Sequence, residues 1–304
     1  MILTEVGTIE RFIPEQVNLV DLGSPIRTPQ TLDAAFGREQ GANVVYTTVS
    51  GSATSQQWAL LQVIDADRQR LLGSYPLEGA SSAWAHICTP GGKVYIGASH
   101  KMFVYDPKTQ AVTDLGVPIP GTESIWALTA AEEGNVYGGI YSGSVGGRVF
   151  RIDGRTHEMI DLLGAPVDDG STEGASGRRE DYVRSLVYDS GMLYAGTGST
   201  NGRVWRIDPR TRQAVKIELP EPADDPVYGG RFANMGAVYG LTVADRQLFV
   251  FFNGPFTMHV YDLDRRCWRD KVIADVRGQL AVTPPYGGKV YTSKRDGRLW
   301  EIDT

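Results

Sequence analysis

Apolar and polar residues alternate along most of this chain in short runs, and Gly, Pro, Asp or Asn separates one run from the next. Such alternation is the period of a β-strand that buries one face. No long segment repeats its apolar residues with the period of a helix. The pattern therefore predicts an all-β protein made of many short strands.

Two markers recur along the chain. The first is an apolar strand that ends in Asp before a turn, at Asp65, Asp106, Asp153, Asp208, Asp262 and Asp303. The second precedes it and is centred on an aromatic residue, as in NVVYTTV, GKVYIGA, GNVYGGI, GMLYAGT, RQLFVFF and GKVYTSK. An Asp side chain can cap the turn that follows it. Repeats of about 40 to 55 residues with several strands each predict a six-bladed β-propeller of four-stranded antiparallel blades.

The third repeat shows the expected strands most clearly, at 125–131, 135–141, 147–153 and 158–164. The last repeat has no fourth strand, because the chain ends one residue after Asp303. The segment NLVDLGSP at 18–25 resembles the fourth-strand segment AVTDLGVP at 111–118. We expect residues 17–25 to complete the blade formed by 279–304, which would remove two open sheet edges. This predicts a single domain over 1–304.

Over nearly its whole length the chain resembles a six-bladed β-propeller. The units VYxG…VxRxDxxT are similar to the repeats of propeller enzymes, among them sugar-acting lyases. The resemblance implies that the first strand of each blade lines a central channel, and that the loops before these strands share one face. Because propellers carry many activities, it implies the fold more strongly than the function.

Aligning the six inner strands places one residue of each at the channel mouth. The aligned segments are LDAA, AWAH, IWAL, VRSL, VYGL and RGQL, and their second positions are Asp33, Trp84, Trp126, Arg184, Tyr239 and Gly278. The third position is small in five of the six. The long loops 167–181 and 221–236 are expected on the same face, where loops of such length often bind ligands.

These residues suggest a site for a small polar ligand, since aromatic rings stack on sugars and an Arg fork holds a carboxylate. We expect a lyase-type enzyme acting on an anionic saccharide or a similar small substrate. The candidate catalytic residues are Arg184, Tyr239, His86 and Tyr182, and the candidate substrate-binding residues are Asp33, Trp84, Trp126, Arg179, Tyr228, Arg231 and Asn234.

Other interpretations stay open. The aromatic residues could only fill the channel, Arg184 could pair with Asp33 or Asp181, and His86 could be a satisfied core residue. The protein could also be a non-catalytic propeller that anchors a protein partner through aromatic and Arg residues on its rim.

The composition limits the classes of partner and cofactor that we expect this protein to bind. The net charge of −6 argues against nucleic acid and anionic membranes, and no apolar run has the length of a membrane span. Cys88 and Cys267 lack metal-ligand spacing, and we expect free thiols. A calcium ion on the axis, which the resemblance to six-bladed enzymes suggests, would have only Asp33 and Asn234 here, so we expect no metal and no cofactor. We expect a monomer, either cytoplasmic or secreted with its signal removed.

Overall fold

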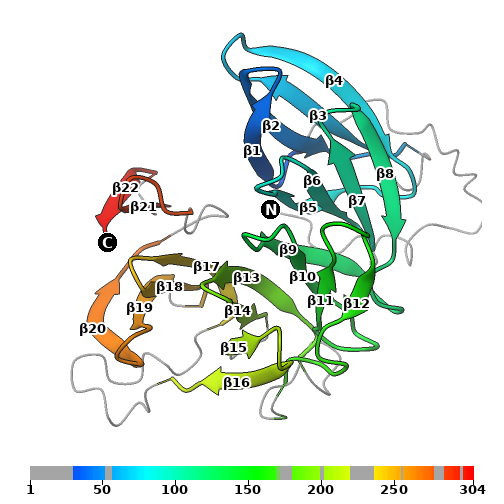
Figure 1. Ribbon diagram of the computed structural model, residues 1–304. Coiled ribbons are helices and arrows are strands. Elements are labelled where there is room, and N and C mark those ends of the chain that lie inside the picture. Colours follow the sequence, from blue (N-terminus) through cyan, green and yellow to red (C-terminus); the bar gives the residue numbers. More distant parts are fainter. Residues whose placement is uncertain are drawn as a thin grey trace, which may run out of the picture.

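The computed structural model describes residues 30–51, 57–168, 170, 180–198, 202–219, 236–254, 256–276, 284–294 and 297–304. Within this part of the chain there is no helix, and the strands form five four-stranded antiparallel sheets and one two-stranded sheet. Figure 1 shows the sheets arranged around a common axis, with the first strand of each four-stranded sheet innermost. The all-β propeller of antiparallel blades is therefore confirmed.

Each four-stranded sheet is called a blade, numbered in chain order. Blade 1 consists of β1 (Ala34–Glu39), β2 (Ala42–Val49), β3 (Ala59–Asp65) and β4 (Arg70–Leu77). Blade 2 consists of β5 (Ala83–Cys88), β6 (Val94–Ala98), β7 (Lys101–Asp106) and β8 (Ala111–Gly116). Blade 3 consists of β9 (Ser124–Ala130), β10 (Val136–Tyr141), β11 (Val149–Ile152) and β12 (Met159–Asp161). Blade 4 consists of β13 (Val183–Asp189), β14 (Met192–Thr197), β15 (Val204–Asp208) and β16 (Gln213–Ile217).

Blade 5 consists of β17 (Val238–Ala244), β18 (Gln247–Phe252), β19 (Thr257–Asp262) and β20 (Cys267–Ile273). The two-stranded sheet pairs β21 (Lys289–Ser293) with β22 (Leu299–Asp303), where the sixth repeat was predicted. The predicted closing strand at 17–25 and the sixth inner position, Gly278, lie outside the described residues. The ring closure stays a prediction.

The Asp that ends the third strand of a blade caps the following turn. Asp153 Oδ1 accepts the backbone N–H groups of Arg155 and Thr156, each at 2.9 Å. These backbone hydrogen bonds hold the pKa of Asp153 below its usual range. The turn then ends in a residue with positive φ, such as Gln110 at 54° or His157 at 61°. The first sequence marker is thus a capped turn, as predicted.

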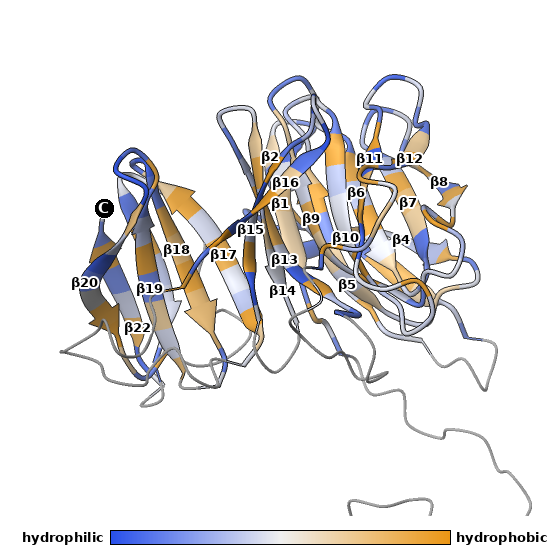
Figure 2. Cartoon of the chain, turned by 90° about the horizontal axis from the view of Figure 1, so that it is seen from below, coloured by the Kyte–Doolittle hydropathy of each residue, from blue (hydrophilic) through white to orange (hydrophobic). Residues whose placement is uncertain are grey.

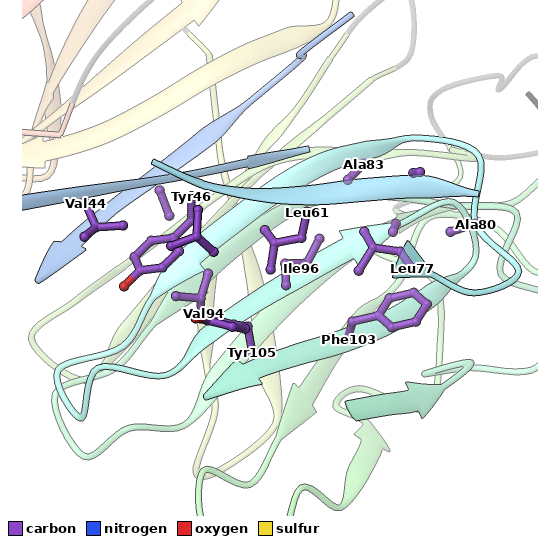
Figure 3. Close-up of a cluster of buried hydrophobic side chains, with 14 of the residues drawn as sticks. Val44, Tyr46, Leu61, Leu77, Ala80, Ala83, Val94, Ile96, Phe103 and Tyr105 are labelled. Atoms are coloured by element: carbon purple, nitrogen blue, oxygen red, sulfur yellow. The ribbon is translucent and has the colours of Figure 1, made fainter. Parts of the chain in front are cut away.

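The hydrophobic core lies between neighbouring blades. Figure 3 shows the cluster between blades 1 and 2, where Tyr46 and Leu61 meet Ile96 and Phe103. Figure 2 shows hydrophobic residues concentrated within the strands and hydrophilic residues gathered at the turns. Burial between blades, and not within one blade, therefore holds the propeller together.

The glycine of the second marker lets neighbouring blades approach. A Cβ atom built on it would collide with the side chain that begins the inner strand of the next blade. The pairs are Gly97 with Ile125 Cγ2 (2.5 Å), Gly139 with Val183 Cγ1 (2.6 Å), and Gly196 with Val238 Cγ1 (2.3 Å). Real Cβ contacts are longer than this, so only glycine fits here without a shift. These contacts bring the starts of β9, β13 and β17 close against the preceding blade.

Cys88 and Cys267 lie on blades 2 and 5, and neither forms a disulfide. Among the residues that the structure describes, no three His, Cys, Asp or Glu side chains are grouped as a metal site would need. No helix in the same part of the chain could cross a membrane.

Candidate functional site

Each of four predicted mouth residues is the extra residue of a β-bulge. In blade 2, Ala83 pairs with Ala98 and Ala85 with Gly97, so Trp84 has no partner on β6. The same shift leaves out Trp126, Arg184 and Tyr239 at the starts of β9, β13 and β17. A bulge bends the strand and re-aims its side chain. The four side chains are partly exposed although their neighbours in the strand are largely buried.

These four residues, called the aromatic–arginine row, contact one another in chain order. The ring centroids of Trp84 and Trp126 are 4.1 Å apart. The guanidinium carbon of Arg184 lies 5.0 Å from the Trp126 ring centroid and 4.2 Å from that of Tyr239. The guanidinium therefore has an aromatic neighbour on blade 3 and another on blade 5, a geometry that favours the cation.

Arg184 has no acidic partner among the described residues. Its Nε is buried without a hydrogen-bond acceptor, and so is the Nε1 of Trp126. The predicted alternative, an ion pair with Asp33 or Asp181, is not formed; Asp33 contacts His86 instead, at 3.3 Å. A buried donor without an acceptor costs about 1–3 kcal/mol. Two such donors side by side mark a place where a ligand or water would supply acceptors.

Tyr182 extends the row. Its ring meets Trp126 edge-on at 5.2 Å and Tyr141 at 5.6 Å. Burial raises the pKa of the Tyr182 phenol to about 12, and the nearby Arg184 only partly opposes this. The phenol therefore keeps its proton at neutral pH and is a hydrogen-bond donor.

His86 lies behind the channel wall. Its Nδ1 is 3.3 Å from Asp33 Oδ2 and its Nε2 is 2.7 Å from Thr48 Oγ1. Its side chain has 0% exposure, whereas that of Asp33 has 37%. His86 also donates its backbone N–H to Asp33 at 2.6 Å. His86 thus holds Asp33 in place, and Asp33 is the accessible group at this end of the row.

Two acidic residues stand just before β13. Glu180 and Asp181 are buried, at 1% and 2% exposure. Their carbonyl groups accept the backbone N–H groups of Gly147 and Ser142, each at 2.9 Å. This strap joins the start of blade 4 to blade 3. The remaining candidates, Arg179, Tyr228, Arg231 and Asn234, lie outside the described residues.

The sequence alignment found the row but not the bulges that create it. The signal was the small third position, which holds Ala85, Ala127, Ser185 and Gly240 directly after the bulged residues. Ser185 shows one reason, since its Oγ donates to the carbonyl group of Val238 on the next blade at 3.0 Å. A large side chain at this buried position would separate the blades.

Comparisons with known proteins give the fold. No family model and no curated protein matches the sequence. The structure is similar to a chain of hydrazine synthase from Kuenenia stuttgartiensis, with a TM-score of 0.66 at 14% identity over 90% of this chain and 84% of that one. A chain of the mitotic checkpoint complex gives a TM-score of 0.59 at 15% identity, over 96% and 84% of the two chains.

A chain of a nidogen/laminin complex gives a TM-score of 0.54 at 11% identity, over 81% of this chain and 80% of that one. These neighbours are propeller-type proteins with different roles, and fold alone does not carry function. The comparisons therefore identify the chain by its architecture, a β-propeller of antiparallel blades.

Proposed function

We propose that the aromatic–arginine row binds a small anionic ligand, with an acidic saccharide as the leading class. The observation that carries this proposal is the position of Arg184, stacked between Trp126 and Tyr239 with no carboxylate partner among the described residues. A carboxylate at the guanidinium edge forms a two-point hydrogen bond. The part of the Trp84 ring that remains accessible would then stack on the apolar face of a sugar.

We further propose a lyase reaction at this site. When Arg184 neutralises the carboxylate of a uronic acid, the hydrogen on the neighbouring carbon becomes more acidic. A base takes this proton, a carbon–carbon double bond forms, and the carbon–oxygen bond to the next sugar breaks. Tyr239 on one side of Arg184 is the candidate base, and it would accept the proton in its phenolate form. Tyr182, which keeps its proton at neutral pH, is suited to protonate the leaving oxygen.

The test compares Arg184→Ala and Arg184→Lys with wild-type protein. The substrate is a mixture of uronic-acid oligosaccharides, with binding measured by calorimetry and cleavage by the absorbance of the new double bond. Both variants should lose binding, since an ammonium group does not reproduce the planar fork. Arg155→Ala removes the same charge from an exposed turn and should bind like wild type.

Two results would contradict the proposal. If Arg184 were a structural strut, Arg184→Ala would lower the free energy of unfolding by clearly more than the about 0.5 kcal/mol of an ordinary surface substitution. If wild-type protein binds no anionic saccharide, the proposed ligand site is wrong. A non-catalytic propeller that anchors a protein partner then becomes the better hypothesis. Binding without cleavage would keep the ligand class and reject the lyase reaction.

A further inference from the structure

A cavity of ≈350 Å³ lies between blades 3 and 4, at the opposite end of the strands from the aromatic–arginine row. Tyr188 lines it near the end of β13, whereas Arg184 stands near the start of the same strand. Four residues of strand span about 13 Å. The cavity is therefore a separate place from the candidate site, although both are lined by Tyr and Arg.

Arg151 is the residue that makes this cavity polar. It pairs with Tyr137 on β10. The corresponding positions, opposite the central aromatic residue of the second strand, hold Val63, Val104 and Val260 in blades 1, 2 and 5, and Arg206 in blade 4. Those three valines have 0%, 5% and 8% exposure and fill the space beside the neighbouring blade. The fold thus accepts valine here, and Arg151 is not needed to build a blade.

The guanidinium of Arg151 forms no ion pair in the described part of the chain, although it lies near enough to Asp153 to lower the pKa of that carboxyl group. Its Nε is buried without an acceptor, and none of the ion pairs formed there includes it. Burying part of a charged group without a partner is unfavourable. What the structure leaves open is the buried Nε of Arg151, and an anion in the cavity would supply the missing acceptor.

The turn between the third and fourth strands of blade 4 leaves the cavity open. The matching turns of blades 2 and 3 contact the preceding blade and close the space between the two blades. In blade 2 the positive-φ residue Gln110 donates from Nε2 to Glu39 of blade 1 at 3.0 Å. In blade 3 the same position is His157, which lies 3.1 Å from both the Lys93 Nζ and the Tyr95 hydroxyl of blade 2. In blade 4 it is Arg212, which lines the cavity.

The rest of the lining suits a flat anion. The rings of Tyr137 and Tyr188 are nearly parallel, at 7° with centroids 5.9 Å apart, and form one aromatic wall. Arg210 and Glu133 complete the charged part of the lining, and Arg210 already contacts Asp208 at 3.5 Å. Arg151 and Arg212 form no ion pair in the described part of the chain, and they outnumber the one carboxylate of the lining, Glu133. The volume is within the range of small-molecule sites.

We propose that this cavity binds a small organic anion, a carboxylate or phosphate on a ring-shaped body, with Arg151 and Arg212 as the anion contacts and the two tyrosines as the wall. The proposal does not rest on the proposed function, because the two sites share no residue. It assigns a second ligand site to the seam between blades 3 and 4.

The experiment titrates the full chain with phenyl phosphate, benzoate and inorganic phosphate by calorimetry. Phenyl phosphate and benzoate should bind at the seam, apart from any binding at the aromatic–arginine row, and phosphate should bind more weakly because it lacks the ring. Arg151→Val and Arg212→Gln should each weaken phenyl phosphate by about tenfold or more. The chain itself uses valine and glutamine at the matching positions of other blades, so both variants should fold, which melting curves check.

Arg184→Ala separates the two sites, because it removes any binding at the aromatic–arginine row, and the phenyl phosphate binding that remains in this variant belongs to the seam. Arg155→Ala controls for the loss of one positive charge on an exposed turn of the same face. The proposal is overturned if neither ring-bearing anion binds wild-type protein, or if folded Arg151→Val and Arg212→Gln bind phenyl phosphate as wild type does. Loss of phenyl phosphate binding in Arg184→Ala alone would assign the ligand to the mouth and also refute a second site.

Discussion

The contact between Gly97 of blade 2 and Ile125 of blade 3 allows a direct test of how the seams are built. A Cβ atom at Gly97 would lie 2.5 Å from Ile125 Cγ2 and 3.0 Å from Ile125 Cβ, while the next atom, Ala85 Cβ, is 3.6 Å away. The conflict of Gly97→Ala is therefore with one side chain. Overpacking of this kind costs about 1–3 kcal/mol.

Shortening Ile125 should partly relieve that conflict. Ile125→Ala alone leaves a cavity and should cost about 2–5 kcal/mol, since the side chain is fully buried. In the double variant the added methyl group occupies part of the space that Ile125 leaves. The loss of stability in the double variant should then be about 1–2 kcal/mol smaller than the sum of the two single losses. Because Ile125 precedes Trp126, Gly97→Ala should also weaken ligand binding at the mouth.

The assay is urea unfolding of wild type, the two single variants and the double variant. Gly91→Ala is the matched control, because Gly91 lies in the same blade and a Cβ there would meet only Thr89 Oγ1 at 3.9 Å. This control should stay within about 0.5 kcal/mol of wild type. Additive effects of Gly97→Ala and Ile125→Ala would refute the reasoning that the glycine exists to admit the next blade.

Three further predictions concern other parts of the molecule. The pKa of Asp153 is lowered in the folded state, so its stabilising effect is present above the unfolded pKa of about 4 and is lost as the pH falls further. In Asp153→Asn, the melting temperature should therefore fall less steeply over that acid range than in wild type. Tyr182→Phe should retain ligand affinity but lose turnover, and equal turnover would remove Tyr182 as the proton donor. Deleting residues 1–25 should lower the melting temperature or cause aggregation, and unchanged melting of a monomer would reject the closing strand.

Features that depend on one repeat were predictable from the sequence. The four strands of blade 3 begin and end within a few residues of the predicted bounds, because alternation and turn residues are local signals. The Asp caps are local as well, as Asp153 shows. The alignment of inner strands placed Trp84 and Arg184 correctly relative to one another because every blade repeats the same path.

Features that depend on the register between strands or on the contact between two blades were not predictable. The burial of Glu180 and Asp181 results from hydrogen bonds to Ser142 and Gly147, which lie far away in the sequence. The bulge at Arg184 requires knowledge of the register with β14. The cavity beside Arg151 exists only because the turn of a different blade leaves space there. Periodicity within one strand contains none of this information.

The bulges have a consequence for engineering new specificity. Trp84, Trp126, Arg184 and Tyr239 stand outside the pairing of their strands, while the small residues after them keep the register. A substitution at a bulged residue therefore changes no ladder pair and no contact between a blade glycine and its neighbour. A combinatorial library that varies only these four residues should yield mostly folded proteins with altered ligand preference. The propeller could then serve as a scaffold for selecting receptors of other small molecules.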